Sequence, residues 1–217
     1  MSLILAIESS SNEYRVVLGR EREVVFDSSR EHCEGALRTL GGSLACGLEL
    51  LRVETREIEG VAINVGPGSL TFVRAGISFV NALAFSLKVN IYAFNWFQIM
   101  AQQTRHATQL PVLGVVPAAN DNAYVGLIRG ASVEMMRFGP LHKVVGEVAA
   151  GVEEVAVAGR IRNRVASLLQ GVKIVDTGIE NPDARVLLEL GFDAHESGDH
   201  ATTQVEALND QSDIFYG

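Results

Sequence analysis

The chain has 217 residues, of which 47% are hydrophobic and 20% are charged, which is typical of a globular protein with one large or two small domains. A formal net charge of −8 argues against a protein that grips nucleic acid alone, because such a protein needs a basic face. The uncharged residues 75–87 are too few to span a bilayer, and the N-terminus lacks a signal-peptide pattern. We therefore expect a cytoplasmic protein that does not cross a membrane.

The first half begins with three predicted strands, at residues 3–7, 14–19 and 23–27. A polar turn with Glu8, Ser9 and Ser10 follows the first strand. Its carboxylate and hydroxyls fit a phosphate site or a magnesium-bound water, and an exposed hairpin turn is the simpler interpretation.

A long helix is predicted at residues 30–53, with leucines at steps of three and four along one face. Glycines in the same stretch would let another helix approach closely. Cys33 and Cys46 fall thirteen residues apart in this helix, or about 20 Å. Because that separation is beyond disulfide reach, we expect reduced thiols, as in a cytosolic protein.

Residues 61–65 predict a buried strand and residues 72–87 a helix, with Gly66, Gly68 and Ser69 in the turn between them. Backbone N–H groups in such a turn can hold a phosphate, although a tight turn without a ligand is the commoner case. The helix is apolar nearly all round. It is therefore either a central core helix or a helix shared with a second protein.

A strand at residues 89–94 and a helix at 96–105 precede a polar stretch, which predicts lobes of residues 1–107 and 108–217. In the second half we expect strands and helices at residues 111–116, 122–129, 133–138, 155–158, 160–170, 172–175 and 182–190, and a tail helix after residue 201. Both halves place three strands before alternating helices and strands. This order suggests the two-lobed actin-like ATPase (ribonuclease H-like) fold of the α/β class, with a mixed sheet flanked by helices in each lobe.

Three segments resemble the TsaB (YeaZ) family of that superfamily: Ile-Leu-Ala-Ile-Glu-Ser-Ser-Ser at residues 4–11, Arg-Glu-His at 30–32, and Ile-Asn-Val-Gly-Pro-Gly-Ser-Leu-Thr-Phe-Val-Arg-Ala-Gly-Ile at 63–77. The likeness is strong over residues 3–105 and loose beyond. It implies a non-catalytic partner subunit of the machinery that makes N6-threonylcarbamoyladenosine beside the anticodon of certain tRNAs. Such a subunit pairs with a TsaD-like transferase, is bound by a TsaE-like ATPase, forms a homodimer when alone and meets tRNA only indirectly.

The resemblance implies that one face of each of the helices predicted at residues 30–53 and 72–87 forms the partner interface. The expected interface residues are His32, Leu37, Leu40, Leu44, Leu48, Val73, Ile77, Val80 and Ala84. The two polar turns become a degenerate nucleotide site, at Glu8, Ser9, Ser10, Gly66, Gly68 and Ser69. Phe72 stands where the family usually has glycine, and the turn at residues 117–122 lacks the family's arginine. We therefore expect no catalytic residue, no metal and no firmly bound cofactor, and leave ATP or ADP with magnesium as a candidate only in the full complex.

Two other functions stay open on sequence alone. One is a self-standing nucleotide-binding ATPase that uses Glu8 and the two turns, which calorimetry with ATP and magnesium would reveal. The other is a peptidase, which would need a metal. The stretch from His195 to His200 contains metal-capable residues but has no periodicity and no cysteine, which predicts an exposed loop.

Overall fold

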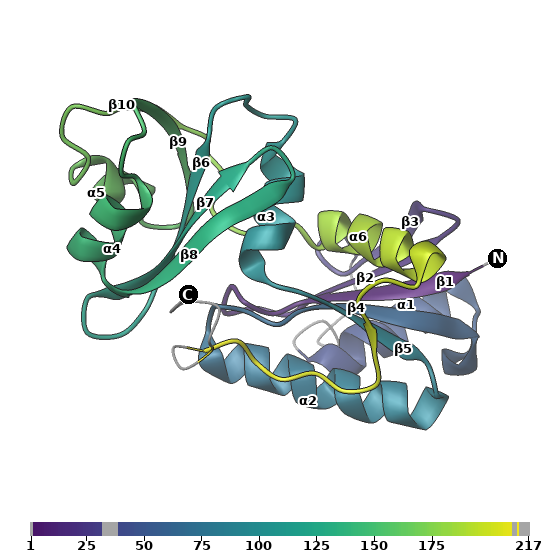
Figure 1. Ribbon diagram of the computed structural model, residues 1–217. Helices are drawn as coiled ribbons and strands as arrows, with labels where there is room; N and C mark the ends of the chain where they lie inside the picture. The colour runs from purple at the N-terminus through teal and green to yellow at the C-terminus, as the bar shows by residue number, and fades with distance from the viewer. Residues whose placement is uncertain (1, 32–38, 210–211, 213–217) are drawn as a thin grey trace. The chain divides into compact units, whose positions relative to one another are not determined.

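The computed structural model describes residues 2–31, 39–209 and 212. The chain forms two compact units (Figure 1). The first comprises Met1–Asn95 and Asp183–Ala207, and the second comprises Trp96–Pro182 and Leu208–Gly217. Each unit is built on one mixed sheet with helices packed on its faces.

The first unit has a six-stranded sheet of order β11-β5-β4-β1-β2-β3. The first three strands form an antiparallel meander, and the next two run parallel to β1. Its strands are β1 (Leu3–Glu8), β2 (Arg15–Arg20), β3 (Glu23–Asp27), β4 (Ile58–Asn64), β5 (Asn90–Phe94) and β11 (Ala201–Thr202). Strand β1 lies between two neighbours and under helices on both faces, and all six of its residues are buried, which explains its unbroken apolar sequence.

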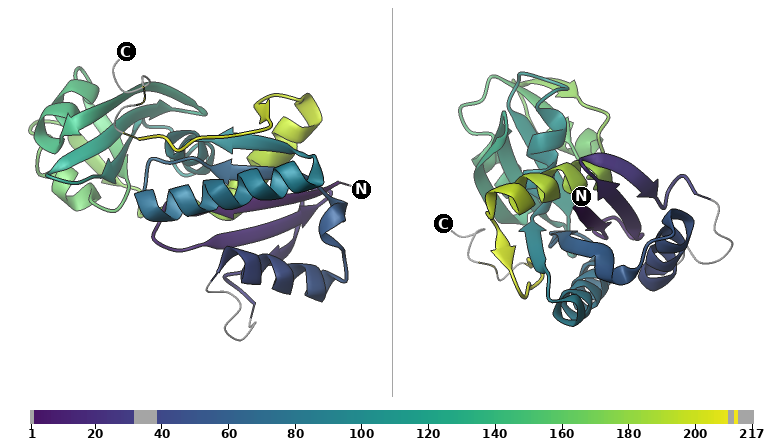
Figure 2. Two further views of the ribbon diagram at one scale, coloured as in Figure 1. Left: turned by 90° about the horizontal axis from the view of Figure 1, so that it is seen from below. Right: turned by 90° about the vertical axis from the view of Figure 1, so that its right-hand side faces the viewer.

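Helices cover both faces of this sheet. They are α1 (Leu40–Leu51), α2 (Leu70–Leu87) and α6 (Ala184–Ser197), with a short 3-10 helix at Thr55–Glu57. Consecutive strand residues point to opposite faces. Leu18 of β2 contacts α1, whereas its neighbour Gly19 faces Leu188 of α6. Figures 1 and 2 accordingly show α1 and α2 on one face and α6 on the other.

The second unit repeats this plan with a five-stranded sheet of order β10-β9-β6-β7-β8. An antiparallel meander is again followed by two strands parallel to its first member. The elements are α3 (Trp96–Thr104), β6 (Val112–Pro117), β7 (Asn122–Arg129), β8 (Ser132–Pro140), α4 (Leu141–Val148), β9 (Glu154–Ala158), α5 (Arg162–Ala166) and β10 (Lys173–Asp176). The predicted duplication is confirmed.

The units do not divide at the expected boundary between residues 107 and 108. Helix α3 belongs to the second unit, because Phe97 packs against Gly126 of β7, where a Cβ would lie 2.6 Å from its ring. Helix α6 belongs to the first unit. Its Gly191 allows close approach to the first sheet, since a Cβ there would lie 2.7 Å from the Cβ of Ala62.

Only part of the long helix expected at residues 30–53 is confirmed, because helix α1 covers Leu40–Leu51 and residues 30–31 are not helical. Helix α1 begins only at Leu40, where Thr39 caps it by accepting a hydrogen bond from the Gly42 N–H. Cys46 is disulfide-bonded, so the expectation of reduced thiols, which assumed one continuous helix, is wrong. Residues 32–38, which include His32, Cys33 and Leu37, lie outside the described residues.

Three further predicted elements differ near the C-terminus. The helix expected at residues 160–170 shortens to α5. The helix expected at residues 182–190 is α6, which starts after its Asp183 cap and runs through Gly191 to Ser197. The described residues after 201 form no helix. They begin with the short strand β11, which pairs with β5.

Among the described residues, α2 is one helix that is long and apolar enough to cross a membrane, by length and composition alone. The helix begins at Leu70 and includes Arg74, so it is longer than the uncharged stretch of residues 75–87. The helix packs on β4 and β5 of the first sheet and is an integral part of that unit.

Candidate functional site

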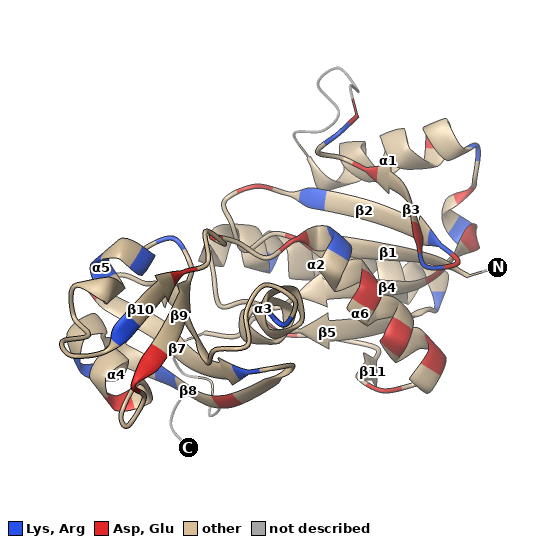
Figure 3. Cartoon of the chain, turned by 90° about the horizontal axis from the view of Figure 1, so that it is seen from above, with Lys and Arg blue, Asp and Glu red and all other residues tan. Residues whose placement is uncertain are grey.

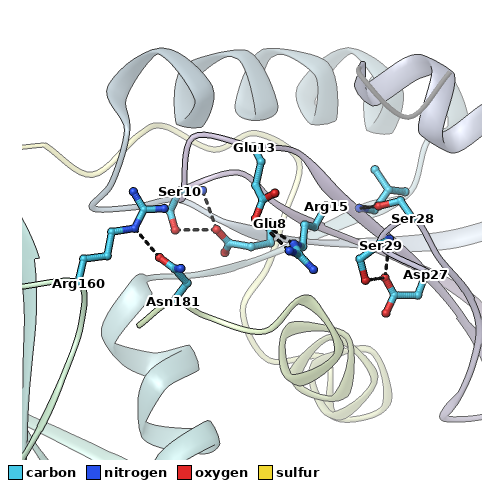
Figure 4. Close-up of polar contacts among 10 residues, drawn as sticks. Glu8, Ser10, Glu13, Arg15, Asp27, Ser28, Ser29, Arg160 and Asn181 are labelled. Carbon is cyan, nitrogen blue, oxygen red and sulfur yellow. Dashed lines mark hydrogen bonds and ion pairs between the residues drawn. The ribbon is translucent and has the colours of Figure 1, made fainter. Parts of the chain in front are cut away.

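The residues expected to bind a nucleotide meet at the ends of β1 and β4. Oε1 of Glu8 accepts hydrogen bonds from both the N–H and the hydroxyl of Ser10, each at 2.6 Å (Figure 4). Oε2 of Glu8 accepts one from Asn64 Nδ2 at 2.6 Å. The Ser69 N–H donates to the Ser10 carbonyl at 2.9 Å, and the Gly66 N–H donates to Oδ1 of Asn64 at 2.9 Å. The two polar turns are therefore bonded to each other.

This mutual bonding leaves little for a phosphate to use. The N–H groups of Ser10, Gly66 and Ser69 all donate to protein acceptors. Gly68 touches the other turn directly, since a Cβ there would lie 2.5 Å from the Cβ of Ser10 and 2.7 Å from its carbonyl oxygen. Ser9 is fully buried, with its hydroxyl beside Gly76 of α2. The geometry is that of a closed structural turn.

Glu8 is unsuited to holding a magnesium-bound water, because only 2% of the residue is exposed. Burial raises the pKa of its carboxyl above the ordinary value of 4.5, although the hydrogen bonds from Ser10 and Asn64 act in the opposite direction. Sequence reasoning missed Asn64, which joins the two turns. The available signal was a single amide inside the otherwise apolar strand at residues 61–65.

The described members of the expected partner interface lie inside the first unit. All are buried, with at most 8% of each residue exposed: Leu40, Leu44, Leu48, Val73, Ile77, Val80 and Ala84. The stripe of large apolar side chains on each helix therefore faces its own sheet, and a partner would mainly meet the opposite side of the helices. His32 and Leu37 lie outside the described residues.

The outward side of the two helices is nevertheless short of charge. Residues exposed on α2 follow steps of three and four, and Arg74 is the only charged residue of that helix: Leu70, Thr71, Arg74, Ser78, Ala82, Phe85 and Ser86. Residues exposed on α1 are Gly41, Ala45, Glu49 and Leu50. We call these two sets together the outer face.

The outer face is continuous across the two helices. A Cβ on Gly41 of α1 would lie 4.0 Å from the ring of Phe79 of α2, so the helices are neighbours there. Phe85 is 86% exposed, Leu50 57% and Leu70 47%. Figure 3 shows few charged positions on α1, whereas α6 carries several acidic ones. Exposed apolar patches of this kind commonly mark interaction sites.

One flank of α2 is covered by the chain's own tail. The side-chain amide of Asn81 donates to the Val205 carbonyl at 3.0 Å and accepts from the Val205 N–H at 3.0 Å. Val205 is buried. This two-point contact holds the segment after β11 along the helix, so the outer face is bounded on that side.

The histidines expected in an exposed loop have partners. His195 lies in the last turn of α6, where its Nδ1 is 2.8 Å from the Tyr92 hydroxyl, and the ring of His200 is 5.2 Å from that of Phe94. Within the described ranges, no group of three or more His, Cys, Asp or Glu residues could hold a metal ion.

Two units that repeat one strand order, each a mixed sheet flanked by helices, define the actin-like ATPase fold. The family described as "TsaD: tRNA N6-adenosine threonylcarbamoyltransferase" matches residues 28–197. That match covers well over half of the chain, and the chain belongs to this family.

Two solved structures share the fold along nearly the whole chain. One is an uncharacterized protein from Pseudomonas aeruginosa with similarity to peptidase YeaZ, which is 23% identical, with a TM-score of 0.75 over 97% of this chain and 100% of the other. The second is YeaZ from Pseudomonas aeruginosa, which is 22% identical, with a TM-score of 0.75 over 96% and 100%. No curated protein matches the chain in sequence.

Proposed function

We propose that this chain is a TsaB-type, non-catalytic partner subunit for tRNA threonylcarbamoylation. It pairs with a TsaD-type transferase of its own family and supports that enzyme. Membership of the TsaD family and the fold shared with YeaZ support this function. The resemblance of residues 4–11 and 63–77 to the TsaB family points to the partner branch rather than to the catalytic one.

One observation carries the proposal: α2 is apolar far beyond what its own unit uses. Of its 18 residues only five are buried: Val73, Gly76, Ile77, Val80 and Ala84. A surface helix normally exposes charged residues, and α2 exposes a single arginine. Small residues such as Ser78 and Ala82 at its centre allow the backbone of another helix to come close. A partner with a similar pair of helices fits this surface.

The closed turns support a non-catalytic role. Since the N–H groups of Ser10, Gly66 and Ser69 are engaged within the protein, we expect the isolated chain to bind no nucleotide firmly. ATP or ADP with magnesium would enter only where a TsaE-type ATPase joins the complex. We expect tRNA to be held mainly by the other subunits, since the net charge of this chain is −8. These roles are those of a cytoplasmic complex, and the outer face would form a homodimer in the absence of the transferase.

The test is co-expression with the TsaD-type transferase of the same genome. We expect a stable one-to-one complex with the wild-type chain. Ala82→Glu places a charge at the centre of the outer face and should abolish co-purification, because a buried unpaired charge costs several kcal/mol. Ala131→Glu, an exposed alanine in the β7–β8 turn, is the matched control and should co-purify normally. A complex that survives Ala82→Glu, or no complex with the wild type, contradicts the proposal.

A further inference from the structure

The first unit contains a cavity that the closed turns do not use. Its volume is about 490 Å³, and it lies where the β1–β2 turn, the end of β3 and the first turn of α2 meet. Its lining residues are Asn12, Glu13, Tyr14, Arg15, Ser28, Ser29 and Phe72. Figure 4 shows Glu13, Arg15, Ser28 and Ser29 around this region.

One wall of the cavity is aromatic. The rings of Tyr14 and Phe72 lie with centroids 4.8 Å apart and planes inclined at 41°. Both residues are half-buried, so their ring faces are partly available. Phe72 and Phe79 are seven residues apart and lie on the same flank of α2, and Phe79 is the residue beside α1. Phe72 directly follows Leu70 and Thr71 of the outer face, so the cavity lies beside the N-terminal end of that face.

The polar wall carries one unused carboxylate oxygen. Arg15 donates from Nε and Nη2 to the same oxygen of Glu13, Oε1, at 3.1 and 3.0 Å. Among the described residues, Oε2 of Glu13 has no hydrogen-bond or ion-pair partner. Arg15 also interacts electrostatically with Asp183, so its charge is opposed from two sides. Oε2 of Glu13 is therefore open to a hydrogen-bond donor that enters the cavity.

The charge of the whole unit favours a basic ligand. The first unit contains ten Lys and Arg against 17 Asp and Glu, a formal net charge of −7 out of the chain's −8. Such a field attracts basic groups to the surface. A long basic side chain combines an apolar stem, which packs on aromatic rings, with a cationic head that interacts with ring faces and carboxylates.

We infer that this cavity receives a Lys or Arg side chain of the protein that docks on the outer face. The stem of that side chain lies against Tyr14 and Phe72, and its head bonds Oε2 of Glu13. The inference rests on the proposed function for the identity of the partner. The cavity itself can be tested without the partner.

The first experiment uses the isolated chain labelled with ¹⁵N and titrated with butylguanidinium, followed by NMR. We expect saturable shifts at Tyr14, Arg15 and Phe72, absent in Glu13→Gln. Two further probes give the alternatives: butylurea, the neutral analogue, and adenosine, which would stack on the rings as a nucleobase. Equal shifts with butylurea, saturation by adenosine instead, or shifts that persist in Glu13→Gln would overturn the inference.

The second experiment measures affinity for the TsaD-type transferase. Glu13→Gln should weaken pairing about tenfold, since charge-assisted contacts at an interface are worth roughly 1.5 kcal/mol or more. Glu21→Gln, an exposed carboxylate in the β2–β3 turn, is the control and should have no effect. If the wild type pairs and Glu13→Gln pairs equally well, the inference fails and the proposed function stands. If the wild type does not pair, the proposed function fails and the guanidinium titration still decides the cavity.

Discussion

The two units share one strand order but differ in the helix that follows their fourth strand. In the first unit β4 is followed by α2, with 18 residues and an apolar outer side. In the second unit β9 is followed by α5, with five residues. The arginines of α5 are engaged within their own unit, Arg162 with Asp176 and Glu180. The proposed docking surface therefore rests on the length and composition of this one helix rather than on the shared fold.

The turns after the first strand of each meander differ in the same way. In the first unit the turn is buried and bonded to the β4–α2 turn through Glu8 and Asn64. In the second unit residues 118–121 form an exposed turn, with Asp121 paired to Arg164 at the surface. Among the described residues, buried polar side chains of this turn fix the start of a long helix in the first unit and not in the second.

The largest expected effect separates the two sides of α2. Val80→Asp buries an unpaired carboxylate in the first unit and should lower the free energy of unfolding by more than about 4 kcal/mol. Ala82→Glu lies two residues away on the outer face and should change it by less than about 0.5 kcal/mol. Urea denaturation of both variants measures the difference. Similar losses in the two variants would show that both sides of the helix are core.

The second prediction compares an exposed apolar side chain of each unit. Phe85→Ala should weaken pairing with the transferase about tenfold, because aromatic side chains at interfaces often contribute a large share of the binding free energy. Leu168→Ala, at an exposed leucine just after α5, should leave pairing unchanged. Isothermal titration calorimetry measures both affinities. A larger loss with Leu168→Ala would move the docking surface to the second unit.

The third prediction concerns pH and the buried turn. The pKa of the Glu8 carboxyl is higher in the folded chain than its ordinary value of 4.5. As the pH rises from about 4.5, this carboxyl therefore loses its proton in the unfolded chain first. The stability contributed by Glu8 is complete below that pH and is lost as pH rises through the folded pKa. Glu8→Gln removes this contribution, so the wild type minus Glu8→Gln difference in free energy of unfolding should fall with rising pH.

Denaturation of wild type and Glu8→Gln between pH 4 and 8 tests this prediction. Asp121→Asn, in the exposed turn of the second unit, serves as the comparison and should change stability by less than about 0.5 kcal/mol. A constant difference between wild type and Glu8→Gln across that range would mean that the buried carboxyl does not titrate as its burial requires.

The smallest expected effect is at the tail contact on α2. Asn81→Ala removes both hydrogen bonds to Val205 and should cost about 1–2 kcal/mol locally. The expected sign is faster amide hydrogen exchange at Val205, with little change in the global free energy of unfolding. Ser86→Ala, at an exposed position of the same helix, should change neither. Unaltered exchange at Val205 in Asn81→Ala would show that the contact with Asn81 does not hold the tail along α2.

Several elements of the first unit could be predicted from the sequence. Strand β1 and helix α2 were predicted closely, because an unbroken apolar run and a glycine-rich turn are strong local signals. The lack of charge on α2 left two alternatives open, a central core helix and a helix shared with a second protein. The burial of the expected interface residues was not foreseen, because periodicity reveals which side chains share a face and not which face meets the sheet. Only packing showed that Val80 points inward and Phe85 outward.

Other features depended on contacts between distant residues. The closed turn rests on Asn64 reaching Glu8 across two neighbouring strands, which no local pattern encodes. The return of α6 to the first unit rests on Gly191 fitting against Ala62. The cavity beside Phe72 combines residues from three separate segments. In the sequence Phe72 stands where the TsaB family usually has glycine, and in the structure it forms part of the wall of this cavity.

The central claim is that this chain supports a transferase and is not the catalyst. Its most direct test is threonylcarbamoyladenosine formation on tRNA with purified TsaD-type transferase, TsaE-type ATPase and a threonylcarbamoyl donor. We predict product when wild-type chain is added, background levels with Ala82→Glu, and none from this chain without the transferase. Product formed by this chain alone, or formed equally well in its absence, would contradict the account.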